Sequence, residues 1–246
     1  MRVCTFVPAA LGACLITAGA VATPVFVGHI NFADSYGSTG GGEFRAWGQA
    51  DFTLTPAATG TPFQGGIPAA SGLFETFCVE RFENLPFDIT DYKADLNTET
   101  VAQNSAYAGG NHGGFNDPLD ARTAYLYTHF INMNLSTPYD YVNEANRIDD
   151  ANALQTAIWF IEQEDSTPLL GKALDLYNEA NNAVNSGAWV GLGDVRILNI
   201  YTNTARVDYQ DVLVMTSIPL PGGAGMAGAA LAGLGGMVTL RRRRKN

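Results

Sequence analysis

The sequence predicts an α+β fold: a single β-rich domain at residues 23–217 with a central block of three helices. Strand-like apolar runs occupy the first third of this region, three segments with helical spacing follow, and strand-like runs return near its end. This order of strands, helices and strands favours one α+β domain over a chain of βαβ units. No internal repeat is visible.

The strands are predicted from short runs rich in β-branched and aromatic residues, bounded by residues that favour turns. A loop rich in Ser, Thr and Gly at residues 35–42 separates the first two runs. The predicted strands are residues 25–32, 43–55, 73–82, 195–201 and 209–215.

Each of the three helical segments begins with a capping signal. Aspartate and threonine side chains accept hydrogen bonds from the first backbone N–H groups of a helix, and proline fits the first helical position. The predicted helices are 119–131, which follows Asp117-Pro118; 149–161, which begins with Asp149-Asp150; and a third, which follows Thr167-Pro168 and stops at Gly187.

The C-terminal residues 218–246 have three consecutive parts. Ile218-Pro219-Leu220-Pro221 leads into an apolar run, rich in Gly and Ala, that ends at Leu240. At about 1.5 Å per residue, this segment is long enough to cross a hydrocarbon core of roughly 30 Å as a single transmembrane helix. A basic cluster would then stay in the cytoplasm and place the domain outside. The alternative is a flexible tail with a solvated charge run. The cluster consists of Arg241, Arg242, Arg243, Arg244 and Lys245.

This tail resembles the PEP-CTERM family of bacterial sorting signals, in its VPLPA-type variant. The matching parts are the motif with Pro219, Leu220 and Pro221, the apolar run and the basic cluster. The resemblance implies recognition by an exosortase-type membrane enzyme, removal of the helix near the proline motif, and delivery to the cell envelope, the surface or an exopolysaccharide matrix.

The N-terminus predicts a secretory signal peptide at residues 1–22. A short basic start at Met1-Arg2 precedes an apolar stretch at residues 3–18, and Ala20-Val21-Ala22 supplies the small-x-small cleavage pattern. A lipoprotein cleavage site at Leu11-Gly12-Ala13-Cys14 is the alternative. Both ends therefore predict an exported domain.

Charge and cysteine content limit what the exported domain can do. The chain has a net charge of −10, and all 24 acidic residues lie between residues 23 and 217. Such a domain repels phosphate backbones, so nucleic acid is excluded as a partner. Of the three cysteines, Cys4 and Cys14 leave with the signal peptide. Cys78 remains without a partner for an internal disulfide.

Two segments of the domain resemble the bacterial surface thioester domain of adhesins. One is Phe77-Cys78-Val79-Glu80 on a predicted strand, and the other is Leu154-Gln155-Thr156-Ala157-Ile158-Trp159 on a predicted helix. The resemblance implies an internal thioester between the Cys78 sulfur and the Gln155 side-chain carbonyl. A lysine amine of a surface target would displace the sulfur and leave that target attached through an amide. The alternatives are a degenerate domain of the same fold, and an ordinary buried cysteine beside an amphipathic helix.

Other candidate residues have weaker support. His112, in a Gly-rich loop, would suit a general base or a metal ligand, but a single histidine in such a loop usually belongs to a mobile connection. His129 lies on a predicted helix, where a histidine is more often a packed or rim residue. An acidic cluster lacks the spacing of a calcium loop and is expected to be a solvated face. Glu80 and Glu162 are a candidate carboxylate pair for hydrolysis. No conventional catalytic, metal or cofactor motif is present in the sequence. The acidic cluster is Asp88, Asp91 and Asp95.

Three functions follow from these observations. The first is a covalent adhesin or matrix cross-linker that uses Cys78 and Gln155. The second is a noncovalent structural protein of the envelope or exopolysaccharide, with Cys78 as a free thiol. The third is a secreted hydrolase that uses carboxylates or His112.

Overall fold

The computed structural model describes residues 23–37, 41–66, 72–101, 117–202 and 207–216. All of them belong to one compact unit. The predicted signal peptide, the sorting tail and His112 lie outside the described residues. Within these ranges, none of the helices combines the length and apolar character needed to span a membrane.

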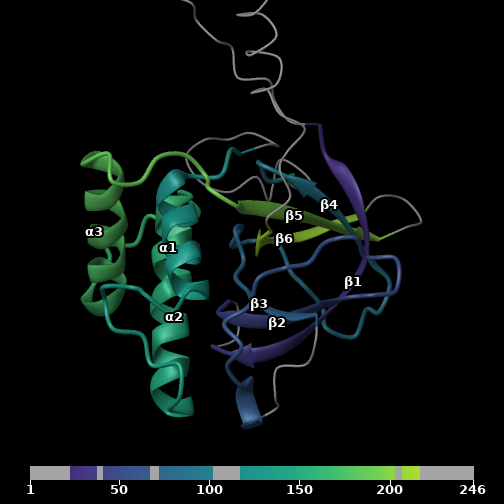
Figure 1. The fold of residues 1–246 in the computed structure, drawn as a ribbon, viewed down its shortest axis with the longest axis horizontal. Helices are drawn as coiled ribbons and strands as arrows, with labels where there is room; N and C mark the ends of the chain where they lie inside the picture. Colours follow the sequence, from purple (N-terminus) through teal and green to yellow (C-terminus); the bar gives the residue numbers. More distant parts are fainter. Residues whose placement is uncertain (1–22, 38–40, 67–71, 102–116, 203–206, 217–246) are drawn as a thin grey trace, which may run out of the picture. The chain divides into compact units, whose positions relative to one another are not determined.

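Six antiparallel strands form one sheet in the spatial order β3-β2-β1-β4-β5-β6 (Figure 1). Three helices follow β4 along the chain and precede β5, so the predicted α+β fold with a central helical block is confirmed. The strands are β1 (Val25–Tyr36), β2 (Glu43–Gly48), β3 (Leu73–Thr76), β4 (Tyr92–Asn97), β5 (Val195–Thr202) and β6 (Val207–Met215).

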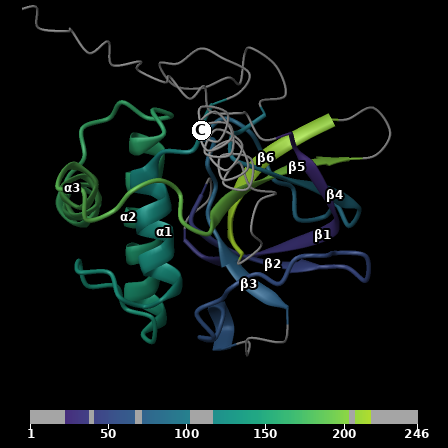
Figure 2. The same cartoon turned by 45° about the horizontal axis from the view of Figure 1, so that its top comes forward.

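The two ends of this sheet meet just after β3. The Leu213 N–H donates to the Phe77 carbonyl (3.1 Å), and the Val79 N–H donates to the Asp211 carbonyl (3.0 Å). These bonds form an antiparallel bridge in which Cys78 lies opposite Val212. The sheet therefore curls until β6 lies beside the chain that leaves β3 (Figure 2).

The helices α1 (Ala121–Ile131), α2 (Glu144–Ile161) and α3 (Gly171–Asn185) lie together on one side of the sheet (Figure 1). Helix α1 contacts β5 and β6, whereas α2 contacts β1 and β2. Helix α3 packs against α1 and α2. The helices thus cover one side of the curled sheet.

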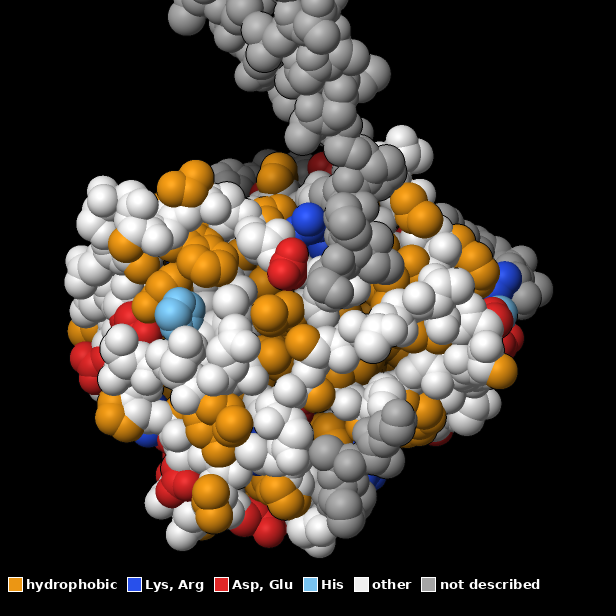
Figure 3. All heavy atoms as spheres, viewed as in Figure 1, with side chains coloured by type: hydrophobic (Ala, Val, Ile, Leu, Met, Phe, Trp, Pro, Cys, Tyr) orange, Lys and Arg blue, Asp and Glu red, His pale blue; other side chains and the backbone are white. Residues whose placement is uncertain are grey.

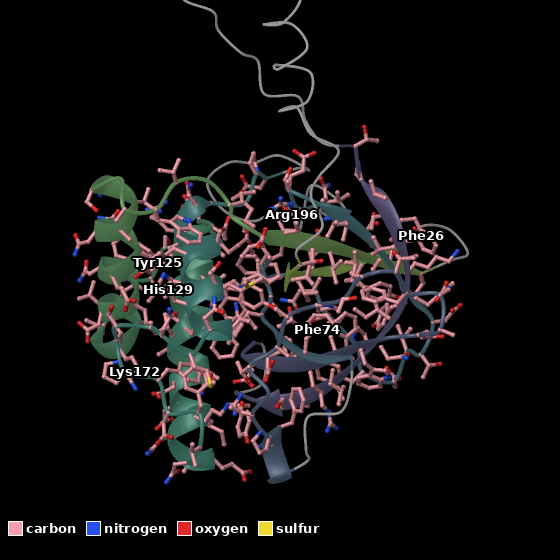
Figure 4. The ribbon with its side chains drawn as sticks, viewed as in Figure 1. Phe26, Phe74, Tyr125, His129, Lys172 and Arg196 are labelled. Carbon is pink, nitrogen blue, oxygen red and sulfur yellow. The ribbon has the colours of Figure 1, made fainter. Side chains whose placement is uncertain are left out.

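Alternating strand residues divide the interior into two cores. Ile197 and Leu213 point toward the helices, and their neighbours Leu198 and Val212 point into the curl of the sheet. Phe74, which is labelled in Figure 4, also belongs to the core within that curl. This alternation is expected for strands with both faces buried.

Three predicted strands have different ends in the structure, and one strand was missed. The first runs to Tyr36 instead of ending at residue 32. The second strand ends at Gly48 instead of residue 55, because the chain turns there and the Phe52 N–H donates to the Gln49 carbonyl (3.0 Å). The third ends at Thr76 instead of residue 82, and only the bridge at Cys78 continues its pairing. Strand β4 was not predicted, although Tyr92, Ala94 and Leu96 alternate with polar residues and are buried.

The helix starts also differ from the predictions. Helix α1 is capped by Asp120, and Pro118 instead forms a bridge with Glu99. Helix α2 begins after Asn143, whose side chain accepts from the Asn146 N–H (3.3 Å), so the predicted cap pair, Asp149-Asp150, lies inside the helix. Helix α3 begins at Gly171 without a side-chain cap. The predicted capping residues therefore lie near the helix starts but do not cap the helices.

Candidate functional site

The candidate site lies where α2 crosses the bridge between the chain after β3 and β6. Leu154, Ile158 and Ile161 form the apolar stripe of α2 and are buried in the core beneath the helix. Gln155 is adjacent to this stripe and is only 1% exposed. The packing of α2 therefore carries an amide side chain into the interior, at the level of Cys78.

The Gln155 carboxamide binds both backbone groups of Cys78. The Cys78 N–H donates to Gln155 Oε1 (3.0 Å), and Gln155 Nε2 donates to the Cys78 carbonyl (2.8 Å). The Phe77 carbonyl and the Val79 N–H form hydrogen bonds with β6. The N–H and carbonyl of Cys78, which lies between them, therefore point away from β6. The side chain of Gln155 thus takes the place of a further strand, and the structure brings the two predicted thioester residues together.

A second backbone donor reaches the same oxygen from the β1–β2 connection. The Gly42 N–H donates to Gln155 Oε1 (3.2 Å), so this carbonyl oxygen accepts two buried backbone N–H groups. Such a pair is the arrangement that stabilises negative charge on an oxygen during acyl transfer. Residues 35–42 were predicted only as a loop, and Gly42 was not among the predicted site residues.

Only glycine fits at position 42. Its φ is +124°, and an added Cβ would lie 2.8 Å from both the Gly37 Cα and the Tyr36 carbonyl oxygen. The run of three glycines at residues 40–42 was the available signal, since close backbone approach is a common reason for glycine.

Gly41 and Trp159 cover the aliphatic part of Gln155. An added Cβ at Gly41 would lie 2.3 Å from Trp159 Cη2 and 2.8 Å from Gln155 Cγ. The indole N–H of Trp159 donates to the Glu80 carbonyl (3.2 Å), and the Arg81 guanidinium lies 5.7 Å from its ring centre. This cover excludes solvent from the side of the amide that faces Gly41.

Cys78 is fully buried and is a free cysteine in the described part of the chain. Burial raises the pKa of its thiol well above the ordinary value, and the nearby Glu80 carboxyl raises the pKa further. The thiol is therefore protonated at neutral pH and protected from reagents in solution.

The two candidate hydrolytic carboxylates have different neighbours. Glu80 is buried near Asp211, and desolvation raises the pKa of both groups. Glu162 is the C-cap residue of α2, and its oxygens accept from the Asp120 N–H (3.3 and 3.4 Å). Burial raises the pKa of Glu162 to about 8, and the Asp120 and Asp117 carboxylates contribute in the same direction. The described geometry gives no paired arrangement of Glu80 with Glu162.

His129 packs among aromatic rings on α1 (Figure 4). Its ring centre lies 4.1 Å from that of Tyr125 and 6.1 Å from that of Trp189. Hydrophobic side chains surround a histidine on this face of the molecule in Figure 3. The packed-rim interpretation of His129 agrees with these contacts.

The predicted acidic cluster is not a single solvated face. Asp95 is buried in β4 and accepts from the Tyr201 hydroxyl (2.9 Å), whereas Asp88 is exposed and Asp91 lies 3.5 Å from His29 Nε2. Among the residues that the structure describes, no group of His, Cys, Asp or Glu is arranged to hold a metal ion.

No protein-family model, curated protein or solved structure matches this chain.

Proposed function

We propose that this protein is exported to the cell envelope and stores an internal thioester between Cys78 Sγ and Gln155 Cδ. The main observation in support is that the backbone N–H groups of Cys78 and Gly42 both donate to Gln155 Oε1. A carbonyl held in this way is polarised toward attack at its carbon, and the negative charge that develops on its oxygen is stabilised.

Thioester formation would begin with attack of the Cys78 sulfur on Gln155 Cδ. A C–S bond forms, charge accumulates on Oε1 between the two N–H donors, and the C–N bond to Nε2 then breaks. The thiol proton leaves with the nitrogen as ammonia. Because burial raises the pKa of Cys78, proton loss accompanies bond formation and does not precede it.

The product would be neutral and shielded from water. Cys78 and Gln155 are both buried, and Trp159 and Gly41 cover the glutamine side chain. A primary amine that reaches Cδ would form an amide bond, while the C–S bond breaks and the sulfur takes up a proton. The domain would then be covalently attached to its target as an adhesin or matrix cross-linker, without turnover as a conventional enzyme.

The export part of the proposal rests on the two ends of the sequence. The signal peptide at residues 1–22 would direct secretion, and the proline motif, apolar run and basic cluster at residues 218–246 would hold the chain in the inner membrane. An exosortase-type enzyme would then release the domain to the cell surface or exopolysaccharide.

The test is the mass of the mature protein purified from the envelope. We expect a mass lighter by one ammonia than that of the same termini with free Cys78 and Gln155. Methylamine should then add once, at Gln155, and release one thiol that reacts with iodoacetamide in denaturant. The Cys78→Ala protein is the control and should show neither change. An unmodified mass with one free thiol and no methylamine uptake would contradict the proposal.

That contradictory result would support a noncovalent structural protein with a free Cys78. One observation favours this second candidate: the two-point hydrogen bonding of Gln155 to the Cys78 backbone already gives the glutamine a purely structural role.

A further inference from the structure

A cavity of about 650 Å³ lies beside the end of β2. Arg45 and Trp47 line it from β2, and Leu73 lines it from the paired strand β3, directly opposite Trp47. The chain that follows β2 contributes Phe52 and residues 54–56. This volume lies within the range of roughly 300–1,000 Å³ that small-molecule sites occupy.

Arg45 is a cation without a partner in the described part of the chain. It lies opposite Glu75 on β3, a position where an ion pair would be expected. The Glu75 carboxylate instead accepts hydrogen bonds from the N–H and the hydroxyl of Thr59, and it lies 3.9 Å from the Arg147 guanidinium. The Arg45 side chain forms no hydrogen bond or ion pair with any described residue, although its Nε is buried. Since all 24 Asp and Glu residues lie within the described ranges, none of them is paired with Arg45.

The surroundings of Arg45 favour an anionic ligand. A buried donor without a partner is costly, and a carboxylate binds a guanidinium through two parallel hydrogen bonds. Among the described residues that line the cavity, none is Asp or Glu. Asp51, which precedes Phe52 in the chain, is paired with His29 Nδ1 (2.6 Å). More distant carboxylates are screened over about 8 Å at physiological ionic strength, so a local anion site is compatible with the negative charge of the chain.

Trp47 supplies a flat apolar surface beside this cation. Arg45 and Trp47 are two positions apart on β2, so their side chains leave the same face of the strand roughly 7 Å apart. A sugar ring has a face of C–H groups that packs on an indole, and a carboxylate on that ring would reach Arg45. Gln49 and Thr55 add polar groups to the lining. Gln49 Nε2 donates to the Thr90 carbonyl (3.0 Å), which leaves the Gln49 Oε1 to accept from a hydroxyl. These polar groups favour a sugar acid over a simple aromatic acid, which has no hydroxyl group to bind.

We propose that this cavity binds a hexuronate, a sugar whose carboxylate is held by Arg45 and whose ring packs on Trp47. The binding is noncovalent. It does not rest on the proposed thioester, because neither Cys78 nor Gln155 is among the residues that line the cavity. The guanidinium determines the preference for an acidic sugar over a neutral one, whereas the indole contributes equally to the binding of both.

The experiment measures dissociation constants by ligand-observed NMR, with the protein purified from the envelope and four probes. The probes are the methyl glycosides of galacturonate and glucuronate, each compared with its methyl ester, which keeps every ring hydroxyl but carries no charge. We expect at least one uronate to bind about tenfold or more tightly than its ester, because the ester lacks the charge-assisted bonds to Arg45. Arg45→Gln should abolish this preference, and Arg45→Lys, which keeps the charge, should reduce it less. Trp47→Ala should weaken the binding of acid and ester alike.

Arg122→Gln on α1 is the matched control, because it removes the same charge at a residue that does not line the cavity. It should leave the preference for the acid intact. Arg45→Gln should fold normally, since Arg45 has no hydrogen bond or ion pair to lose within the described part of the chain, and circular dichroism checks this. Equal binding of acid and ester, binding of neither uronate, or equal weakening by Arg45→Gln and Arg122→Gln would overturn the assignment of the cavity.

Discussion

Replacing Gln155 with alanine should destabilise the domain far more than replacing Cys78 with alanine. The Gln155 side chain satisfies three buried backbone groups: the N–H of Cys78, the N–H of Gly42 and the carbonyl of Cys78. Gln155→Ala leaves all three without this partner. Cys78→Ala removes only a small buried side chain and keeps the three bonds.

The expected magnitudes follow from these contacts. A buried backbone group that loses its partner costs about 1–3 kcal/mol, so the three groups together should cost Gln155→Ala roughly 3–9 kcal/mol of unfolding free energy. Lost packing in Cys78→Ala should account for only about 1–2 kcal/mol, to which the loss of a thioester would add. The larger loss is a substantial fraction of the 5–15 kcal/mol that typically stabilises a domain.

Comparison of each variant with the wild-type protein tests whether the thioester forms. Both variants lack the cross-link, so the difference between them reports the hydrogen bonds of Gln155 together with the packing of the two side chains. Cys78 and Gln155 are 77 positions apart. A covalent bond across that separation would stabilise the folded state by about 4 kcal/mol in the chain-entropy description used for disulfides. If the thioester forms, Cys78→Ala should therefore lose about 5–6 kcal/mol.

Urea unfolding, followed by tryptophan fluorescence, gives these free energies. The comparison requires that the wild-type protein and the two variants have the same m-value, the slope of the unfolding free energy against urea concentration. Equal stability of Cys78→Ala and Gln155→Ala would refute the three-bond role of Gln155. A loss of only about 1–2 kcal/mol in Cys78→Ala would agree with a free thiol.

Three other predictions follow from the site and the sequence. The pKa of Glu162 is raised from its ordinary 4.5 to about 8, so the folded state binds this proton more strongly than the unfolded chain does. The free energy of unfolding should therefore fall as the pH rises from about 5 to 8, by a few kcal/mol at most. Urea titrations at several pH values measure this fall, and Glu162→Gln should make it smaller. An unchanged slope would show that other groups set the pH dependence. Gly42→Ala should destabilise the domain by about 1–3 kcal/mol more than Gly60→Ala. Both glycines have positive φ, but only at Gly42 would an added Cβ meet backbone atoms. Thermal unfolding measures the difference, and equal shifts in the two melting temperatures would contradict this packing. Deleting residues 241–245 should move the protein from the envelope into the medium in cell fractionation, because the cations supply much of the stop signal; equal retention of both forms would mean that another part of the chain provides the anchor.

Local pattern was sufficient to predict the type and order of most elements. Alternating and helical spacings depend on neighbours a few residues apart, and they gave five of the six strands approximately, as well as the three helices. The same spacing placed Gln155 beside the buried stripe of its helix. Cys78 stood out because residues 23–217 contain no second cysteine.

The start of α2 was decided by a distant partner. Arg147, a long charged residue in a polar stretch, is fully buried because its guanidinium binds the Glu43 carboxylate (2.5 and 3.0 Å) and lies 4.3 Å from the Tyr36 ring centre. The helix was predicted to begin at Asp149, because no residue near Arg147 in the sequence indicates that its side chain is buried.

The chemistry of the site was decided in the same way. A hydrogen bond between the Gly42 N–H and Gln155 joins positions 113 residues apart, and it exists only because the sheet curls and α2 packs across it. The resemblance of two short motifs to thioester domains suggested Cys78 and Gln155 as the groups with the chemistry for acyl transfer. Only the tertiary structure determines which backbone donors reach the carbonyl oxygen, since that depends on contacts between segments whose separation in the chain leaves no periodic signal.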